Sequence, residues 1–137
     1  MLEIINEIIK KLNTEIKNFF LEDNVSVDNV EEYFEMRICD AVLKLTAAYY
    51  EQKDLECLNN KTQRKREGLV VERRNERRAI LTKIGLLEYQ RTYYQKTGTD
   101  NIEYVYPVDK IAGIDSRQRL SNSICASLVE QSIKESY

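Results

Sequence analysis

Residues 79–94 read AILTKIGLLEYQRTYY, and this stretch decides the fold. Two runs rich in β-branched, aliphatic and aromatic side chains, which favour strands, flank Gly85. A tight turn between two strands needs a positive φ, which glycine accepts without steric cost. The stretch therefore predicts an antiparallel β-hairpin about Gly85. In its first strand Ile80, Thr82 and Ile84 share one face, and we expect that face to pack against helices.

The first sixty residues predict a pair of helices. Apolar side chains recur at intervals of three and four over residues 2–20, and again from Asp28 to about Leu58, which is the spacing of one helix face. Asp28 is expected to cap the second helix. The two apolar stripes favour antiparallel packing within the chain, and they also suit a dimer interface between two copies. Polar residues 59–62 then predict a linker.

The rest of the chain adds short elements. A β-branched run at residues 68–71 and the segment 103–106, which Pro107 ends, predict short strands. Ser121 is expected to cap a last helix. The predicted fold class is therefore α+β. Its three parts are an acidic helical hairpin at 1–60, a basic linker with a small antiparallel β-sheet at 61–115, and a C-terminal helix at 116–137 that reads as cut short because no stop signal follows it.

The composition excludes several classes of function. The chain has 137 residues with no His and no Trp, which rules out histidine-based acid–base catalysis and Ser–His or Cys–His nucleophile pairs. Its three cysteines form no CxxC motif and its 4 glycines are dispersed, so we expect neither a metal cage nor a phosphate-binding loop. No apolar run approaches the length of a membrane span. We expect a cytoplasmic, non-enzymatic protein without metal, cofactor, membrane or small-molecule substrate.

Charge is segregated along the chain, although the net charge is only -2. Residues 1–60 carry thirteen acidic and six basic side chains, whereas residues 61–92 carry ten basic and four acidic ones. Arginine dominates the basic stretch and suits bidentate contact with phosphate. Either this stretch binds nucleic acid, or it is a solvated strand face paired with the acidic helices. The candidate nucleic-acid-binding residues are Arg64, Lys65, Arg66, Arg73, Arg74, Arg77, Arg78 and Arg91.

Five tyrosines accompany this basic stretch. Base stacking on their rings is typical of proteins that bind single strands. Tyrosines at strand spacing are more often core or sheet-surface residues, and this is the interpretation we favour. They are Tyr89, Tyr93, Tyr94, Tyr104 and Tyr106.

An ordered set of short motifs runs through the second half of the chain. In order they are Leu81-Thr82, Gly85, Arg91-Thr92-Tyr93-Tyr94, Tyr104-Val105-Tyr106-Pro107-Val108-Asp109, Gly113-Ile114, Ser121 and Ser136-Tyr137. This set resembles the N-terminal region of the ISLre-two group of bacterial insertion-sequence transposases, long catalogued as an uncharacterised protein family. The sequence departs from the family pattern at Ile84, where the family often has Phe, and at Val108, where it has Leu. Both positions keep a hydrophobic residue.

The resemblance implies where catalysis is to be sought. Such transposases are expected to hold two divalent metal ions with three carboxylates on an RNase H-like fold, and they commonly act as oligomers. That core needs far more residues than remain in this chain, so the catalytic triad is expected to be absent. The acidic side chains on predicted helices and turns are interpreted instead as solvated or capping groups. They are Asp40, Asp54, Asp100, Asp109 and Asp115.

Two functions remain open from the sequence. The first is a truncated N-terminal module of an insertion-sequence transposase, which contacts DNA at the ends of the element and has no catalytic activity. The alternative is a free-standing protein–protein interaction or dimerisation module. The expected partners are therefore DNA and, in a homo-oligomer, further copies of the chain.

Overall fold

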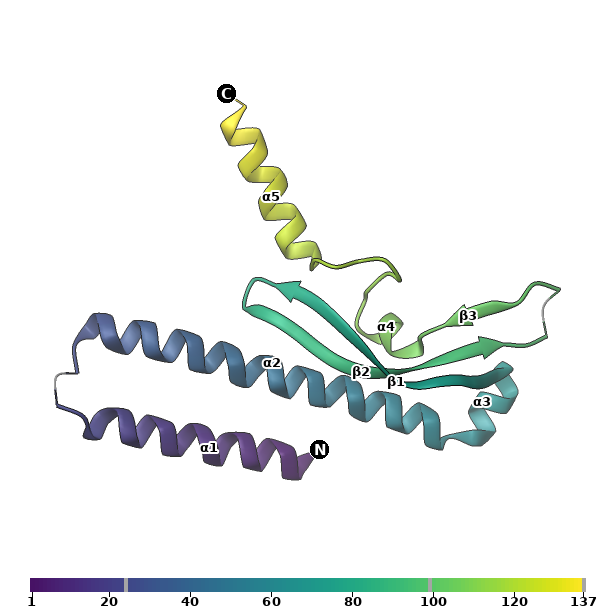
Figure 1. Cartoon of the computed structure of the whole chain (residues 1–137), viewed down its shortest axis with the longest axis horizontal. Coiled ribbons are helices and arrows are strands. Elements are labelled where there is room, and N and C mark those ends of the chain that lie inside the picture. Colours follow the sequence, from purple (N-terminus) through teal and green to yellow (C-terminus); the bar gives the residue numbers. More distant parts are fainter. Residues whose placement is uncertain (24, 99, 137) are drawn as a thin grey trace.

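The computed structural model describes residues 1–23, 25–98 and 100–136. Figure 1 shows α2 lying between α1 and a small sheet, with α5 projecting away from the body. The predicted α+β class, with two N-terminal helices, an antiparallel sheet and a C-terminal helix, is confirmed. In chain order the elements are α1 (Leu2–Leu21), α2 (Val27–Asn59), α3 (Lys61–Glu67), β1 (Leu69–Thr82), β2 (Gly85–Lys96), β3 (Glu103–Val105), α4 (Pro107–Ile111) and α5 (Asn122–Glu135).

The helices α1 and α2 form an antiparallel hairpin, as the apolar stripes predict. Aromatic rings close its looped end, where Phe19 stacks on Tyr33 with centroids 4.3 Å apart and meets Phe34 edge-on at 5.4 Å. The cap of α2 is Ser26, whose hydroxyl accepts the backbone N–H of Asn29 at 3.1 Å. The prediction that Asp28 caps this helix is therefore wrong by two residues. No residue of α1 is fully buried, so this helix packs through one narrow stripe only.

The sheet is built on the predicted hairpin. β1 and β2 pair antiparallel from Thr82 opposite Gly85, and Gly85 adopts a φ of +131° that other residues rarely reach. Ile80 is 2% exposed and belongs to the core, as expected. Ile84 lies in the turn itself and is 42% exposed, so the prediction that it shares the packed face is wrong. β1 begins at Leu69 and continues to Thr82. The short strand predicted at residues 68–71 and the first strand of the hairpin are therefore one strand, and the charged residues between them belong to it.

Both edges of the two long strands are partly covered. β3 pairs with the end of β2, and α2 runs along the rest of that edge. The backbone N–H of Gln90 donates to Glu51 Oε1 at 2.9 Å, so a helix carboxylate replaces a strand partner. On the outer edge of β1, Leu81 pairs with the segment around Leu120 in a parallel bridge. This bridge fixes the start of α5, whose predicted cap at Ser121 is confirmed because its hydroxyl accepts a backbone N–H.

Two short helices differ from the sequence prediction. α3 occupies the predicted linker, and Asn60 caps it by accepting the backbone N–H of Gln63 at 3.1 Å. Gly68 ends α3 in the left-handed conformation, and its carbonyl accepts the backbone N–H of Thr97 at 2.7 Å. α4 follows β3 directly because Pro107 occupies the first helical turn, where its missing N–H costs nothing.

A small core joins α2, β2 and α4. Leu87, Tyr89 and Val108 are buried together, and Leu43, Ala47 and Tyr50 of α2 pack against them. Tyr94, further along β2, is fully buried. Tyr89 and Tyr94 are thus core residues, which confirms the interpretation we favoured for these two tyrosines.

Candidate nucleic-acid interface

The candidate basic residues separate into an exposed set and a buried set. Lys65 and Arg66 on α3 are exposed, as are Arg73, Arg74 and Arg77 on β1. We call these five the basic edge, because they lie along the outer strand of the sheet and on the helix that leads into it. Their exposure leaves the guanidinium and ammonium groups accessible to a phosphate backbone.

Arg64 has a different role from its neighbours on α3. Its side chain is half-buried, and its Nε donates to the backbone carbonyl of Leu58 at 3.1 Å. This hydrogen bond ties the start of α3 to the end of α2. Arg64 therefore supports the basic edge and offers only part of its guanidinium to a ligand.

The middle of β1 is irregular where the basic edge is densest. The pairing with β2 shifts register between Val71 and Arg73 and again between Arg73 and Glu76, and Asn75 adopts a φ of +57°. Such bulges bend a strand and redirect its side chains. Arg73 lies over the ring of Tyr93 at 4.9 Å and pairs with Glu76 at 3.0 Å, yet 63% of its side chain stays exposed.

The exposed ion pairs of the basic edge are weak constraints. Arg77 pairs with Glu88 across the hairpin, and the Arg77 side chain is 68% exposed. Exposed pairs of this kind contribute about 0–1 kcal/mol, and a phosphate can compete for the arginine. The charges of this edge are therefore only partly neutralised by the chain itself.

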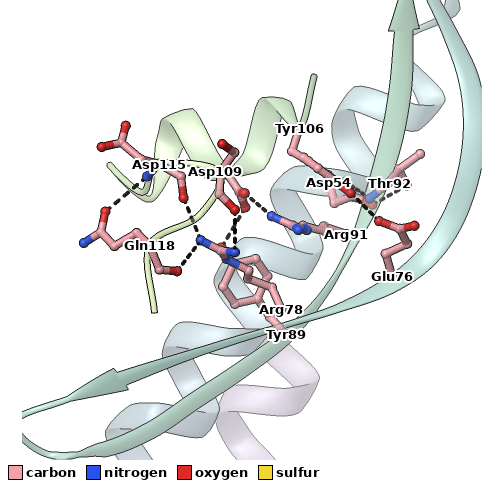
Figure 2. A network of polar contacts seen from close by, with 11 residues as sticks. Asp54, Glu76, Arg78, Tyr89, Arg91, Thr92, Tyr106, Asp109, Asp115 and Gln118 are labelled. Carbon is pink, nitrogen blue, oxygen red and sulfur yellow. Dashed lines mark hydrogen bonds and ion pairs between the residues drawn. The ribbon is translucent and has the colours of Figure 1, made fainter. Parts of the chain in front are cut away.

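Arg78 is buried and serves as a structural clamp. It is 9% exposed, and its guanidinium donates to the backbone carbonyls of Asp115 at 2.7 Å, Ser116 at 3.1 Å and Gln118 at 2.7 Å (Figure 2). These three bonds hold the segment before α5 against β1. A guanidinium occupied in this way cannot reach a phosphate without unfolding that segment.

Arg91 is also withdrawn from the surface. It is 7% exposed, forms an ion pair with the buried carboxylate of Asp109 and lies 3.5 Å from the ring centroid of Tyr106. Tyr89 donates its hydroxyl to Asp109 Oδ1 at 3.0 Å (Figure 2). Asp109 is 4% exposed, so its interpretation as a solvated or capping carboxylate is wrong.

These positions revise the candidate set. The buried Arg78 and Arg91 leave it, and Arg64 with the five residues of the basic edge remain. The burial of these two arginines could have been predicted from the alternation of side chains along a strand. Arg78 shares a face with Ile80, and Arg91 shares one with Tyr89. Residues on those faces point toward the core, and a buried arginine needs the acceptors that residues 109–118 supply.

The remaining tyrosines form a stacked group beside the basic edge. Tyr93 stacks on Tyr104 at 5.1 Å and on Tyr106 at 4.6 Å. Tyr104 is 46% exposed and offers the most accessible ring. Tyr106 donates its hydroxyl to Glu76, and burial together with this hydrogen bond raises the pKa of Tyr106 to about 12. The rings therefore mainly stack on one another, as expected for sheet-surface residues.

The carboxylates considered above are dispersed. Asp54 accepts both the backbone N–H and the hydroxyl of Thr92, so it is a structural acceptor and not the solvated group expected. Asp40 pairs with Lys44 at 2.7 Å on the surface of α2. Across residues 1–23, 25–98 and 100–136, no three potential ligands gather as a metal site needs. Within the same ranges no helix combines the length and the apolar character that crossing a membrane requires.

Comparison with known proteins places this chain in a family. The model of the uncharacterised protein family UPF0236 matches residues 20–137, and the chain therefore belongs to that family. Most of α1 precedes the matched region. Two UPF0236 proteins of Caldanaerobacter subterraneus subsp. tengcongensis are each 34% identical over 85 residues, which is 62% of this chain.

These relatives are much longer than this chain. The matched region makes up 18% of the length of each of the two relatives, and 17% of a third from the same organism. The chain therefore corresponds to a small part of the curated proteins that it matches. No solved structure matches it.

Proposed function

We propose that this chain is an N-terminal module of an insertion-sequence transposase, that it contacts DNA in the bacterial cytoplasm through the basic edge, and that it has no catalytic activity of its own. The motif set of residues 81–137 supports the transposase class by resemblance, and the match to much longer relatives agrees with a partial protein. In this proposal catalysis belongs to the part of the longer relatives that the chain does not match.

One observation carries the DNA-binding role. The five basic side chains of the basic edge are exposed on the consecutive elements α3 and β1, whereas Arg78 and Arg91 are buried and bonded to other parts of the chain. Bulges in β1 redirect arginines at the same place. An exposed arginine cluster on an outer strand, with only weak internal ion pairs, has the chemistry that recognises phosphates independently of sequence.

The experiment measures binding to duplex DNA that carries the terminal repeats of the element, over a series of salt concentrations. Each phosphate that is neutralised contributes about 0.9 to the slope of log affinity against log salt. The triple variant Arg73→Gln, Arg74→Gln, Arg77→Gln is expected to lower that slope by about 2–3. The matched control replaces three exposed lysines elsewhere, Lys83→Gln, Lys110→Gln and Lys134→Gln, and is expected to bind like the unmodified protein.

Two results count against the proposal. One is a folded protein with no affinity for DNA even at low salt. The other is an unchanged salt slope in the arginine variant, which would remove the basic edge from the interface. Far-ultraviolet circular dichroism of each variant separates lost binding from lost folding.

The alternative function also has one observation in its favour. The α1–α2 hairpin exposes large apolar side chains, including Ile9 at 56% and Ile38 at 53%. Exposed apolar surface of this kind marks interaction sites on soluble proteins. A role in self-association is compatible with DNA contact, because the basic edge lies on other elements.

A further inference from the structure

The α1–α2 hairpin presents an apolar stripe on each of its two helices. We call the two stripes together the hairpin face. All of their side chains named here are at least 41% exposed. They are Leu2, Ile9 and Phe20 on α1, and Ile38, Val42 and Tyr49 on α2.

Both stripes lie on the same side of the hairpin. Ile8 and Ala41 belong to the contact between the helices, since both line the same small cavity there. Each residue advances about 100° around a helix axis, so Ile9 lies one step beyond Ile8 and Val42 one step beyond Ala41. The helices run antiparallel, and equal rotations therefore carry Ile9 and Val42 to the same side. Leu43, which packs toward the sheet, lies on a different side of α2.

The two stripes also match each other in level along the hairpin. Phe19 meets Phe34, and Glu15 pairs with Arg37 at 3.6 Å. Because the helices run antiparallel, the numbers of two residues at the same level add up to about 52 or 53. By this relation Leu2 lies within about two residues of the level of Tyr49, and Ile9 within about two residues of Val42. Two of the three apolar side chains named on each helix thus have an apolar counterpart at nearly the same level on the other helix.

We infer that the hairpin face binds a second copy of this chain, so that two hairpins form a four-helix bundle with α1 of each copy over α2 of the other. A two-fold axis parallel to the helices produces this arrangement and keeps every residue at its own level. Under that axis Ile9 meets Val42 of the second copy, and Leu2 meets Tyr49 of the second copy. Each pairing occurs twice.

The area of the face agrees with a stable dimer. α1 has 20 residues and is about 30 Å long, and two adjacent helices are about 20 Å wide. Their overlap covers about 600 Å² on each copy, or about 1,200 Å² in total, which is the lower end of the range for specific interfaces. A face of this size with an apolar centre is large enough for a specific dimer.

Charges at the border of the face are complementary between copies. Lys17 on α1 and Glu35 on α2 lie at nearly the same level, on the outer borders of their two stripes. Neither forms an ion pair with any part of the chain that the structure describes. The two-fold arrangement brings Lys17 of each copy beside Glu35 of the other. A second copy therefore supplies the partners that a single chain does not.

The first experiment measures the mass of the full chain by light scattering during size-exclusion chromatography. We expect twice the chain mass of 16.2 kDa at micromolar concentration. The variant Ile9→Lys with Val42→Lys is expected to run as a monomer with unchanged helix content, since both positions are exposed within one copy. The matched control is Met36→Lys, because Met36 is 69% exposed on α2 outside the face, and this variant should remain a dimer.

The second experiment tests the orientation of the two copies. Lys17→Glu and Glu35→Lys each place like charges together twice, and each is expected to weaken the dimer several-fold in analytical ultracentrifugation. The double variant restores two opposite-charge pairs and should recover the original affinity.

The inference fails if the unmodified chain is monomeric at high micromolar concentration, or if the Ile9→Lys, Val42→Lys variant still dimerises. A double variant weaker than both single variants excludes the proposed placement of α1 over α2. None of these measurements involves DNA, so they are independent of the proposed transposase role.

Discussion

Asp54 on α2 binds Thr92 on β2 through two atoms at once. Its Oδ1 accepts the backbone N–H of Thr92 at 2.8 Å, and its Oδ2 accepts the hydroxyl of Thr92 at 2.7 Å. Glu51 lies one turn earlier and accepts the backbone N–H of Gln90. The helix thus provides acceptors where a further strand would otherwise pair, and this anchors the sheet to α2.

Replacing Asp54 with alanine is expected to destabilise the fold by about 1–3 kcal/mol, because Thr92 is 2% exposed and its donors would lose their partner. Urea unfolding followed by circular dichroism measures this change. The control is Asp40→Ala, which removes an exposed ion pair with Lys44 and is expected to cost no more than about 0.5 kcal/mol. Equal effects of the two substitutions would show that the Asp54 anchor contributes little.

Neighbouring arginines on β1 are expected to respond in opposite ways. Arg78→Lys removes most of the fork that binds three main-chain carbonyls, and a loss of at least about 2 kcal/mol of stability should follow. Arg77→Lys changes an exposed group and should alter stability by less than about 0.5 kcal/mol. Limited proteolysis between residues 112 and 120 should accelerate only in the Arg78 variant. Cleavage at the same rate in both variants is the contrary result.

Gly68→Ala is expected to cost more than Gly98→Ala, although both glycines have a positive φ. An added Cβ at Gly68 would lie 2.5 Å from the backbone oxygen of Thr97, which cannot move freely because Thr97 also bonds to the Gly68 carbonyl. At Gly98 the same atom meets open space. We expect about 1 kcal/mol for backbone strain at Gly98 and at least about 2 kcal/mol at Gly68. Thermal unfolding of the two variants decides between them, and a reversed order would contradict the described end of α3.

The stability of the protein is expected to decline at high pH. Burial raises the pKa of Tyr89 and Tyr94 well above the ordinary value of 10.0, and it raises the pKa of Tyr106 to about 12. The unfolded chain therefore releases these protons near pH 10 while the folded chain retains them. The stabilisation that these three tyrosines provide is therefore fully present below pH 10. It is lost as the pH rises through 10 and past 12.

Ultraviolet absorbance of tyrosinate, recorded with circular dichroism, measures this behaviour. We expect Tyr89, Tyr94 and Tyr106 to ionise only as the fold is lost, at a pH above the ordinary tyrosine value of 10.0. A single titration of all tyrosines near pH 10 in a chain that keeps its native circular dichroism would be incompatible with the buried positions.

The sequence predicts best the elements whose apolar pattern faces a core. The bounds of α1 differ from the expected helix by one residue, and Gly85 marks the hairpin, because periodicity and a required positive φ are local properties. The sequence predicts β1 as too short because residues 72–77 are polar and mostly exposed on an outer edge, where no alternation of apolar and polar residues is needed. The sequence predicts a linker in place of α3 for a similar reason, since α3 has no apolar stripe and depends on its caps.

The sequence predicts only part of the candidate interface. It shows which side chains are charged, but contacts between distant parts of the chain determine which of them are buried. The basic stretch is visible from composition, and its exposed members follow from the outer position of β1. The burial of Arg78 and Arg91 depends on carbonyls and a carboxylate that lie 18 to 40 residues further along the chain. No local pattern indicates that Asp109 will meet Arg91. Pairing of this kind is a tertiary property.

The unbroken course of α2 has a mechanical consequence. Its 33 residues extend for about 50 Å. One end packs against α1 and the other end packs against β2. A single rod thus spans both halves of the molecule without a joint. A displacement of α1 is therefore transmitted by α2 to β2 and, through the pairing of β2 with β1, to the strand that carries Arg73 and Arg77.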